Sequence, residues 1–374
     1  MALRMLGLFM VLPLFTLYAL HLPGATPTLI GLAMGVYGLT QALLQIPFGT
    51  LSDYVGRKQI ITLGLGIFIL GSIIAALSHT IWGVLMGRAL QGAGAIGSTI
   101  IALISDLTRT EQRSKAMAIS GITIGFSFSL AMMLGPILCT WIDVSGIFWL
   151  AAVFSFIAII LLYTFVPDPI VTSTPVKPNW NAFFHLLIHP ELIRLNLGIF
   201  LLHTIFTASF VVIPIALQTF VHLEGNEQWL LYLPILFLAF FSTIPCVILA
   251  EKKQRVKTFF FGAVLLLVIS EVFLWGFTQK LLLSGLNLLL FFSAFSLLEA
   301  FLPSLVSQTA PSSSRGSALG IYSFSQFFGI FVGGVLGGWI YGAFGLIQVH
   351  LFCAILGIFW LCIAFKMKNP QYST

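Results

Sequence analysis

Twelve long apolar runs constrain this chain more than any other feature. A transmembrane helix needs roughly 20 apolar residues to cross a hydrocarbon core about 30 Å thick, whereas a β-barrel would show shorter strands of alternating polarity. The runs cover residues 2–20, 27–50, 59–77, 81–105, 115–141, 146–166, 191–221, 228–249, 256–278, 281–309, 316–342 and 345–366. The sequence therefore predicts an all-α integral membrane protein with twelve transmembrane helices.

Composition and charge agree with this prediction. The chain is 59% hydrophobic and only 7% charged, far more apolar than a soluble domain. We interpret the first run as a retained helix rather than a cleaved signal peptide, because eleven more follow it. With both termini in the cytoplasm, most of the 17 Lys and Arg residues, Arg4 included, fall on the inner side. This spread over short loops argues against a nucleic-acid surface and predicts a multi-pass inner-membrane protein.

One proline-rich segment divides the spans six and six. Residues 167–190 carry five prolines and several polar side chains. The halves also resemble each other, because residues 105–119 align with 307–321 without a gap. We expect an N-terminal six-helix bundle at 1–166, a cytoplasmic linker, a second bundle at 191–366 and a tail at 367–374. Such pseudo-symmetric halves are typical of transporters that rock around a central site.

Polar residues inside the spans are candidates for a substrate cavity. Tyr37, Gln41 and Gln45 recur every four residues and so share one helix face. The full cavity set consists of Tyr37, Gln41, Gln45, Asn196, Asn287, Tyr322 and Gln326. The alternative is that these side chains join helices by hydrogen bonds.

Ionisable residues inside the spans are costly and therefore more informative. Arg88, His203 and Glu299 are the candidates, and the last two can exchange protons during a transport cycle. Glu271 lies in the outer part of its span, where an exposed or structural role is as plausible. Glycine pairs such as Gly121 and Gly125 favour close helix packing, or alternatively interfaces that slide.

No enzyme motif stands out. The chain lacks H-E-x-x-H, a Walker loop and G-x-S-x-G, and its four cysteines form no C-x-x-C pair. We expect no metal and no cofactor. The loops are also too short for a nucleotide-binding domain, so transport should be secondary or facilitated.

Two motifs resemble those of a known family. "GTLSDYVGRK" at 49–58 resembles motif A of the major facilitator superfamily, and "RALQGAG" at 88–94 resembles its motif B. The whole chain is similar to the YajR-type drug:proton antiporters of bacteria. By this resemblance the gate comprises Gly49, Asp53, Gly56, Arg57, Lys58 and Asp106, with Asp53 facing the start of the helix near 315–317. It also assigns Arg88, Gln91 and Gly92 to proton coupling.

Two departures from the family pattern matter. Gly135-Pro136 resembles motif C, but Cys139-Thr140 follows where antiporters have Gly-Gly. The first span also lacks the membrane-embedded Asp of many drug antiporters. The proton carrier should then be Glu299 or His203.

The sequence thus predicts a monomeric secondary transporter that couples protons to the export of a small organic molecule. Its partners would be the substrate, protons and membrane lipid. Two alternatives remain open: a uniporter or proton-linked importer of a metabolite, and a transporter-like sensor that binds a ligand without moving it.

Overall fold

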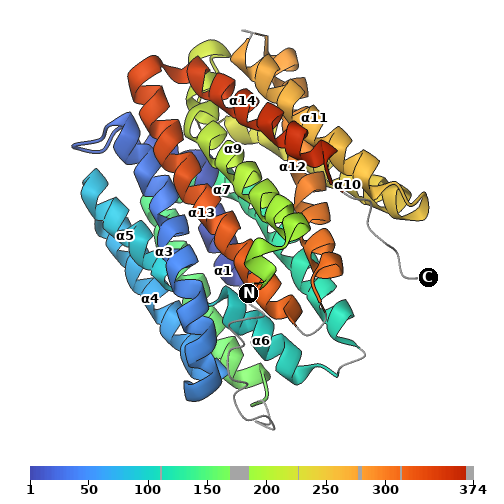
Figure 1. Cartoon of the computed structure of the whole chain (residues 1–374). Helices are drawn as coiled ribbons and strands as arrows, with labels where there is room; N and C mark the ends of the chain where they lie inside the picture. The colour runs from blue at the N-terminus through green and yellow to red at the C-terminus, as the bar shows by residue number, and fades with distance from the viewer. Residues whose placement is uncertain (110–111, 169–184, 226, 277–279, 312–313, 368–374) are drawn as a thin grey trace. The chain divides into compact units, whose positions relative to one another are not determined.

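The computed structural model describes the chain except for residues 110–111, 169–184, 226, 277–279, 312–313 and 368–374. All elements labelled in Figure 1 are α-helices. Eleven helical stretches within the described residues are long and apolar enough to cross a membrane. The all-helical membrane fold is therefore confirmed. Most of the expected linker at 167–190, and the tail from 368 onward, lie outside the described residues.

Contacts divide the chain into two units. Unit 1 comprises Met1–Ala25 and Val36–Pro178, and unit 2 comprises Thr26–Gly35 and Asn179–Thr374. The division between Pro178 and Asn179 falls inside the proline-rich segment expected to separate the bundles. Residues 26–35 are counted with unit 2, which the expected limits of the two bundles did not anticipate.

Two of the expected spans in unit 1 are each broken into two helices. The helices of this part of the chain are α1 (Ala2–Phe9), α2 (Leu12–Ala19), α3 (Pro27–Val55), α4 (Arg57–Leu77), α5 (Ile81–Ala93), α6 (Gly97–Leu107) and α7 (Arg113–Phe165). Pro13 has no N–H to donate back along the chain, which explains the break between α1 and α2. The second break lies at Gly94, where ψ is 51° and the backbone approaches α4 so closely that a Cβ would overlap the carbonyl of Gly64.

Helix α7 contains two of the expected spans rather than one. A continuous stretch from Lys115 to Phe165 has 51 residues. At 1.5 Å per residue it would be about 75 Å long, far more than one hydrocarbon core. Asp143 interrupts it with φ 56° and ψ 178°, which are not helical values. The eleven candidate stretches therefore correspond to the twelve predicted spans.

Unit 2 is built around α9. Its helices are α9 (Pro190–Phe220), α10 (Gln228–Lys252), α11 (Val256–Trp275), α12 (Leu281–Thr309), α13 (Arg315–Phe344) and α14 (Leu346–Phe365). Helix α9 is buried along most of its length and packs against α12, α13 and α14. Gly329 and Gly333 of α13 allow the closest of these contacts, because a Cβ on either would overlap a backbone carbonyl of α9. Unit 2 thus has a central helix that carries polar side chains into its interior.

The glycines singled out in the N-terminal half behave differently from one another. Gly135, which precedes Pro136 in α7, packs on the carbonyl of Met10, so a side chain there would clash. A Cβ added at Gly121 or Gly125, in contrast, would meet no described atom of a neighbouring helix within 4 Å. The close helix packing expected for these two glycines therefore has no described contact behind it and stays a prediction.

Candidate functional site

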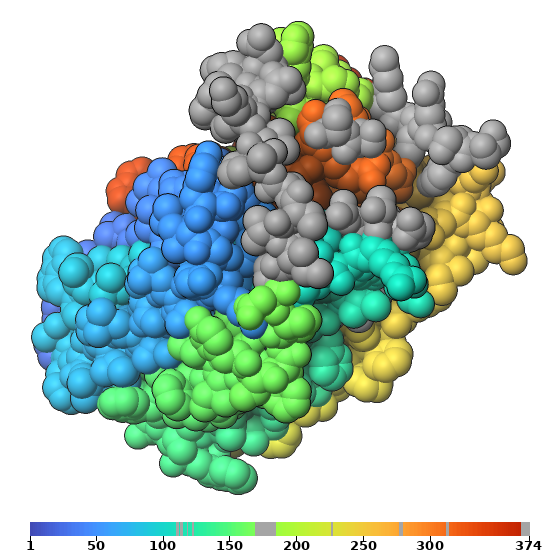
Figure 2. Space-filling model, turned by 90° about the horizontal axis from the view of Figure 1, so that it is seen from below, coloured from blue at the N-terminus to red at the C-terminus, as the bar shows by residue number. Residues whose placement is uncertain are grey.

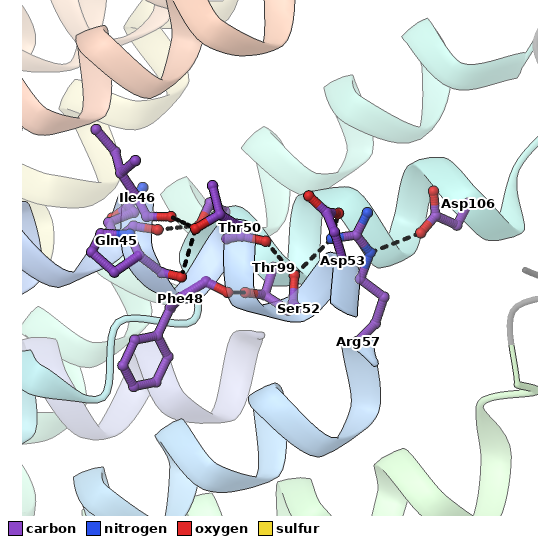
Figure 3. A network of polar contacts seen from close by, with 12 residues as sticks. Gln45, Ile46, Phe48, Thr50, Ser52, Asp53, Arg57, Thr99 and Asp106 are labelled. Atoms are coloured by element: carbon purple, nitrogen blue, oxygen red, sulfur yellow. Dashed lines mark hydrogen bonds and ion pairs between the residues drawn. The ribbon is translucent and has the colours of Figure 1, made fainter. Parts of the chain in front are cut away.

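Asp53 and Arg57 of motif A form one cluster with Asp106 in unit 1, shown in Figure 3. Arg57 Nη1 lies 2.5 Å from Asp53 Oδ1 and 2.6 Å from Ser52 Oγ, while Arg57 Nε lies 2.9 Å from Asp106 Oδ2. Asp53 belongs to α3, Arg57 starts α4, and Asp106 belongs to the end of α6. One guanidinium thus joins three helices.

Local backbone geometry sets up this cluster. Gly56 turns the chain between α3 and α4 with φ 117°, a value that side-chain-bearing residues rarely adopt. Ser98 donates to the Gln45 carbonyl at 2.8 Å and so holds the start of α6 against α3. Gly49 permits that approach, because a Cβ there would lie 3.0 Å from Ser98 Oγ. Gly49 and Gly56 therefore shape the backbone that carries the charged side chains.

The cluster lies at the surface of unit 1 and is only partly shielded from solvent. The side chains of Asp53 and Asp106 are 41% and 39% exposed, and the blue segment around residue 50 lies at the surface in Figure 2. Ion pairs this exposed stabilise by at most about 1 kcal/mol each. Forming or breaking such a cluster therefore changes the free energy of the protein only slightly, as a gate requires.

Lys58 belongs to a different contact from the one that Arg57 makes. Its Nζ lies 2.9 Å from Asp168 Oδ1, just after α7, and 5.7 Å from the ring centroid of Tyr163. It therefore ties the start of α4 to the end of α7. The expected contact of Asp53 with the region 315–317 would join the two units and stays a prediction.

The polar face of α3 is a continuous chain of hydrogen bonds. Tyr37 Oη donates to Gln41 Oε1 at 3.3 Å, and Gln41 Nε2 donates to Gln45 Oε1 at 3.1 Å. Arg4 of α1 adds to this chain through Nη2, at 3.0 Å from Gln41 Oε1 and 3.3 Å from Tyr37 Oη. Arg4 is only 2% exposed, so it lies inside unit 1 rather than on a solvent-facing surface, and its place on the inner side of the membrane stays a prediction.

The residues of motif B form a second buried chain in unit 1. Arg88 Nη1 donates to Gln91 Oε1 at 2.9 Å, and Gln91 Nε2 donates to Ser72 Oγ at 2.8 Å. Gly92 lets α5 approach α3, because a Cβ there would overlap the Tyr37 carbonyl. Within the described part of unit 1, Arg88 is bonded to no imidazole and no carboxylate. Its contacts there therefore include no ionisable group whose proton affinity Arg88 could adjust.

A third polar cluster joins residues from three helices of unit 2; the His203 side chain is 8% exposed and the Glu299 side chain 37%. Gln326 Nε2 of α13 lies 3.1 Å from His203 Nε2 of α9 and donates to Glu299 Oε1 of α12 at 3.0 Å. The second carboxylate oxygen, Oε2, lies 3.8 Å from His203 Nε2 and has no hydrogen-bond partner among the described residues. The two ionisable residues expected to handle protons therefore share one amide.

The remaining cavity candidates have different surroundings. Asn287 bonds to α11 of its own unit. Its amide is oriented to donate to the Ser270 carbonyl and to accept from the Leu274 N–H. This is the helix-joining role, the alternative that the sequence leaves open. Tyr322 Oη and Asn196 Oδ1 are buried without a hydrogen-bond partner in the described structure. Both remain candidates for contact with a polar ligand.

Glu271 is neither exposed nor isolated. It is fully buried, with its Oε2 2.8 Å from His350 Nδ1 and its Oε1 accepting from Ser209 Oγ at 2.7 Å. His350 was not among the sequence candidates, although an imidazole inside the span 345–366 was a visible signal. The pair joins α11 to α14, and Ser209 adds α9.

Replacing Glu271 with Ala is expected to destabilise unit 2. The change leaves His350 and Ser209 buried without their acceptor, and breaking a buried pair in this way costs about 3–5 kcal/mol. Thermal unfolding of the purified protein in detergent measures the effect. Glu271→Gln should retain more stability, and Glu251→Ala, at the exposed end of α10, should be neutral. Equal melting of Glu271→Ala and wild type would contradict a structural role for the pair.

Buried ionisable clusters inside a bundle of membrane-spanning helices define a polytopic membrane protein that handles polar or charged species. Among the described residues, no group of three or more His, Cys, Asp or Glu side chains is placed to hold a metal ion.

The chain belongs to the major facilitator superfamily, whose family model matches residues 1–334 and 195–373. It is 45% identical over 376 residues to the inner membrane transport protein YajR of Escherichia coli, covering 99% of this chain and 82% of that protein. The quinolone resistance protein NorA of Staphylococcus aureus is 26% identical over 217 residues, 54% of this chain and 55% of that protein.

Solved structures agree on the fold. A bacterial homologue of the human lysosomal transporter Spinster, in an inward-facing and occupied conformation, matches with a TM-score of 0.83 at 13% identity, covering 100% of this chain and 96% of that one. Membership of the family makes this chain a multi-pass secondary transporter of small substrates and not an enzyme.

Proposed function

We propose that this chain is a proton-coupled transporter of the inner membrane that exports a small organic molecule by alternating access, with both termini in the cytoplasm. The observation that carries the proposal is the cluster of His203, Glu299 and Gln326 inside unit 2. The names of the relatives support two parts of the proposal: an inner membrane transport protein supports the location, and a quinolone resistance protein supports a small organic compound as the substrate.

The geometry of this cluster suits a reversible proton site. Gln326 has two amide hydrogens, one for Glu299 Oε1 and one for His203 Nε2, which then acts as an acceptor on a neutral ring. If His203 Nε2 took up a proton, its N–H would face the Gln326 amide, which is also a donor. The protonated ring would then favour a hydrogen bond to Glu299 Oε2, which has no partner among the described residues. Protonation therefore changes which of the three helices are bonded together. That is the property that coupling requires.

The motif A cluster is the proposed gate. Arg57 bridges two carboxylates, so protonation or movement of either one weakens the connection between α3, α4 and α6. The domain limits at 1–166 and 191–366 and the cavity roles of Tyr37, Gln41, Gln45, Asn196, Tyr322 and Gln326 belong to the same proposal. In it, the two bundles move as bodies around the polar faces of α3, α9 and α13.

Transport by the reconstituted protein is expected to follow an imposed pH gradient. Proteoliposomes loaded with a pH-sensitive dye would receive a quinolone, together with compounds that raise the melting temperature of the purified protein. A substrate should then move protons and accumulate only when the gradient is present. Flux that ignores the gradient would replace the proposal with a uniporter, and accumulation in the direction of proton flow would replace it with an importer. Ligand binding without any flux would identify a sensor.

A further inference from the structure

Two guanidinium groups in the interior of unit 1 have no counter-charge among the described residues of that unit. Arg4 on α1 is 2% exposed and Arg88 on α5 is 3% exposed. The described carboxylates of unit 1 that form ion pairs do so with Arg57 and Lys58, not with these two arginines. The Nε atoms of both Arg4 and Arg88 are buried without a hydrogen-bond partner. The interior of this unit therefore carries two positive charges and no described negative one.

Tyr37 brings the two charges to one place. Arg4 Nη2 lies 3.3 Å from its hydroxyl, and the Arg88 Cζ atom lies 5.1 Å from the centroid of its ring. Two further rings flank the pair: Phe68 is 5.3 Å from Arg4 Cζ, and Phe15 is 6.0 Å from Arg88 Cζ. Aromatic faces attract cations and shield them when no anion is present. They only partly replace a counter-ion.

The unused donors have the geometry that carboxylates bind. Arginine holds a carboxylate best through two parallel N–H groups, and Nε–H is one arm of the side-on fork. Nε is open in both arginines. In Arg88 the amide of Gln91 occupies Nη1, which lies outside the side-on fork, whereas in Arg4 Gln41 and Tyr37 occupy Nη2, the second arm of that fork, and leave only Nε–H for a ligand. Charged groups within spans are expensive and mark the path of a substrate or ion.

We propose that Arg4, Tyr37 and Arg88 form the substrate's anion-binding site, and that the substrate is a small organic anion with a carboxylate beside an aromatic or apolar body. The carboxylate would neutralise the guanidiniums, and the rings of Phe15, Tyr37 and Phe68 would contact the body. The inference deepens the proposed function and rests on it only for the transport step. Binding itself requires no proton coupling.

Three ligands of nearly equal shape test the charge requirement. Benzoate, benzamide and benzamidine share one ring and carry a negative, a neutral and a positive head group. Binding to the full-length purified protein would be measured by thermal shift and by tryptophan fluorescence, at constant pH and ionic strength and without a membrane gradient. Benzoate should bind at least about tenfold more tightly than benzamide, as expected for hydrogen bonds to a charged group. Benzamidine should not bind. Equal binding of all three, or no binding of benzoate, would overturn the proposal.

Matched variants locate the binding. Arg4→Gln and Arg88→Gln should each weaken benzoate binding about tenfold while melting without ligand no lower than wild type, because each removes an unpaired buried charge. Arg194→Gln is the control, since Arg194 is already paired with Glu191. Unchanged benzoate affinity in both variants would refute the site. If Arg88→Gln does not fold, Arg88→Lys keeps the charge and should still prefer benzoate to benzamide; loss of that preference would count against the site.

The same measurements separate this inference from the proposed function. Benzoate binding that depends on Arg4 and Arg88, together with flux that ignores a pH gradient, would keep the anion site and remove proton coupling. Gradient-driven flux of a neutral compound, with no benzoate binding, would keep proton coupling and remove the anion site. A carboxylate of unit 2 that neutralises the arginines would appear as absent benzoate binding.

Discussion

Glu299→Gln is expected to abolish proton-driven transport while leaving substrate exchange intact. Glutamine has nearly the size of glutamate and its Oε1 can still accept from Gln326, so the contact between α12 and α13 is retained. It cannot take up a proton. Uptake driven by a pH gradient should fall more than about tenfold, which corresponds to roughly 1.4 kcal/mol or more in the coupled step.

The measurement compares two modes of transport in the same proteoliposomes. Gradient-driven flux requires a proton to be carried in each cycle, whereas exchange of labelled for unlabelled substrate at equal pH does not. Glu251→Gln, on an exposed carboxylate of α10, should behave as wild type in both. If Glu299→Gln follows the gradient normally, the proton carrier is another group. His203→Gln then becomes the next variant to test, because His203 is the other ionisable member of the cluster.

The second large effect is expected at the gate. Asp53→Asn retains the size and one acceptor oxygen of the side chain but removes its charge opposite Arg57. Transport should fall about fivefold or more. A fivefold change corresponds to a coupling free energy of about 1 kcal/mol, the lower end of the usual range. The amount of protein in the membrane should remain as in wild type, because an exposed ion pair contributes little to stability. Flux per molecule, normalised by immunoblot of the membrane fraction, measures the change.

Two companion variants sharpen this result. Asp168→Asn alters an exposed carboxylate that pairs with Lys58 and should leave transport near wild type. Asp53→Asn combined with Asp106→Asn should be little worse than the poorer single variant, because both carboxylates act through Arg57. Additive losses would mean that the two acids work independently, and normal flux in Asp53→Asn would remove the gate from the proposal.

The positions of the spans were largely predictable from the sequence. The runs at 228–249 and 281–309 correspond closely to α10, Gln228–Lys252, and α12, Leu281–Thr309. Hydrophobic length alone sets these limits, because the bilayer requires it. The breaks were not predicted. Apolar residues continue through Pro13 and Gly94, so hydropathy gives no signal where the backbone hydrogen bonding changes.

The site was predictable as a set of residue types but not as pairs. Glu299, His203 and Gln326 were each singled out because polar side chains in a span are rare, yet they lie on three helices far apart in sequence. Nothing in one sequence relates the rotation of α9 to that of α12. Asn287 had the same signal and turned out to bond to the backbone of α11.

The sequence by itself determined that this chain crosses the membrane with helices, that it belongs among transporters, and which few polar residues bear a functional hypothesis. These properties follow from the cost of placing polar groups in hydrocarbon, which acts on each residue separately. Only the tertiary structure decided that Arg4 is buried beside Tyr37 and that Glu271 is paired with His350. Such pairings depend on how helices rotate and pack, and these are decided by contacts between residues that the chain order does not relate.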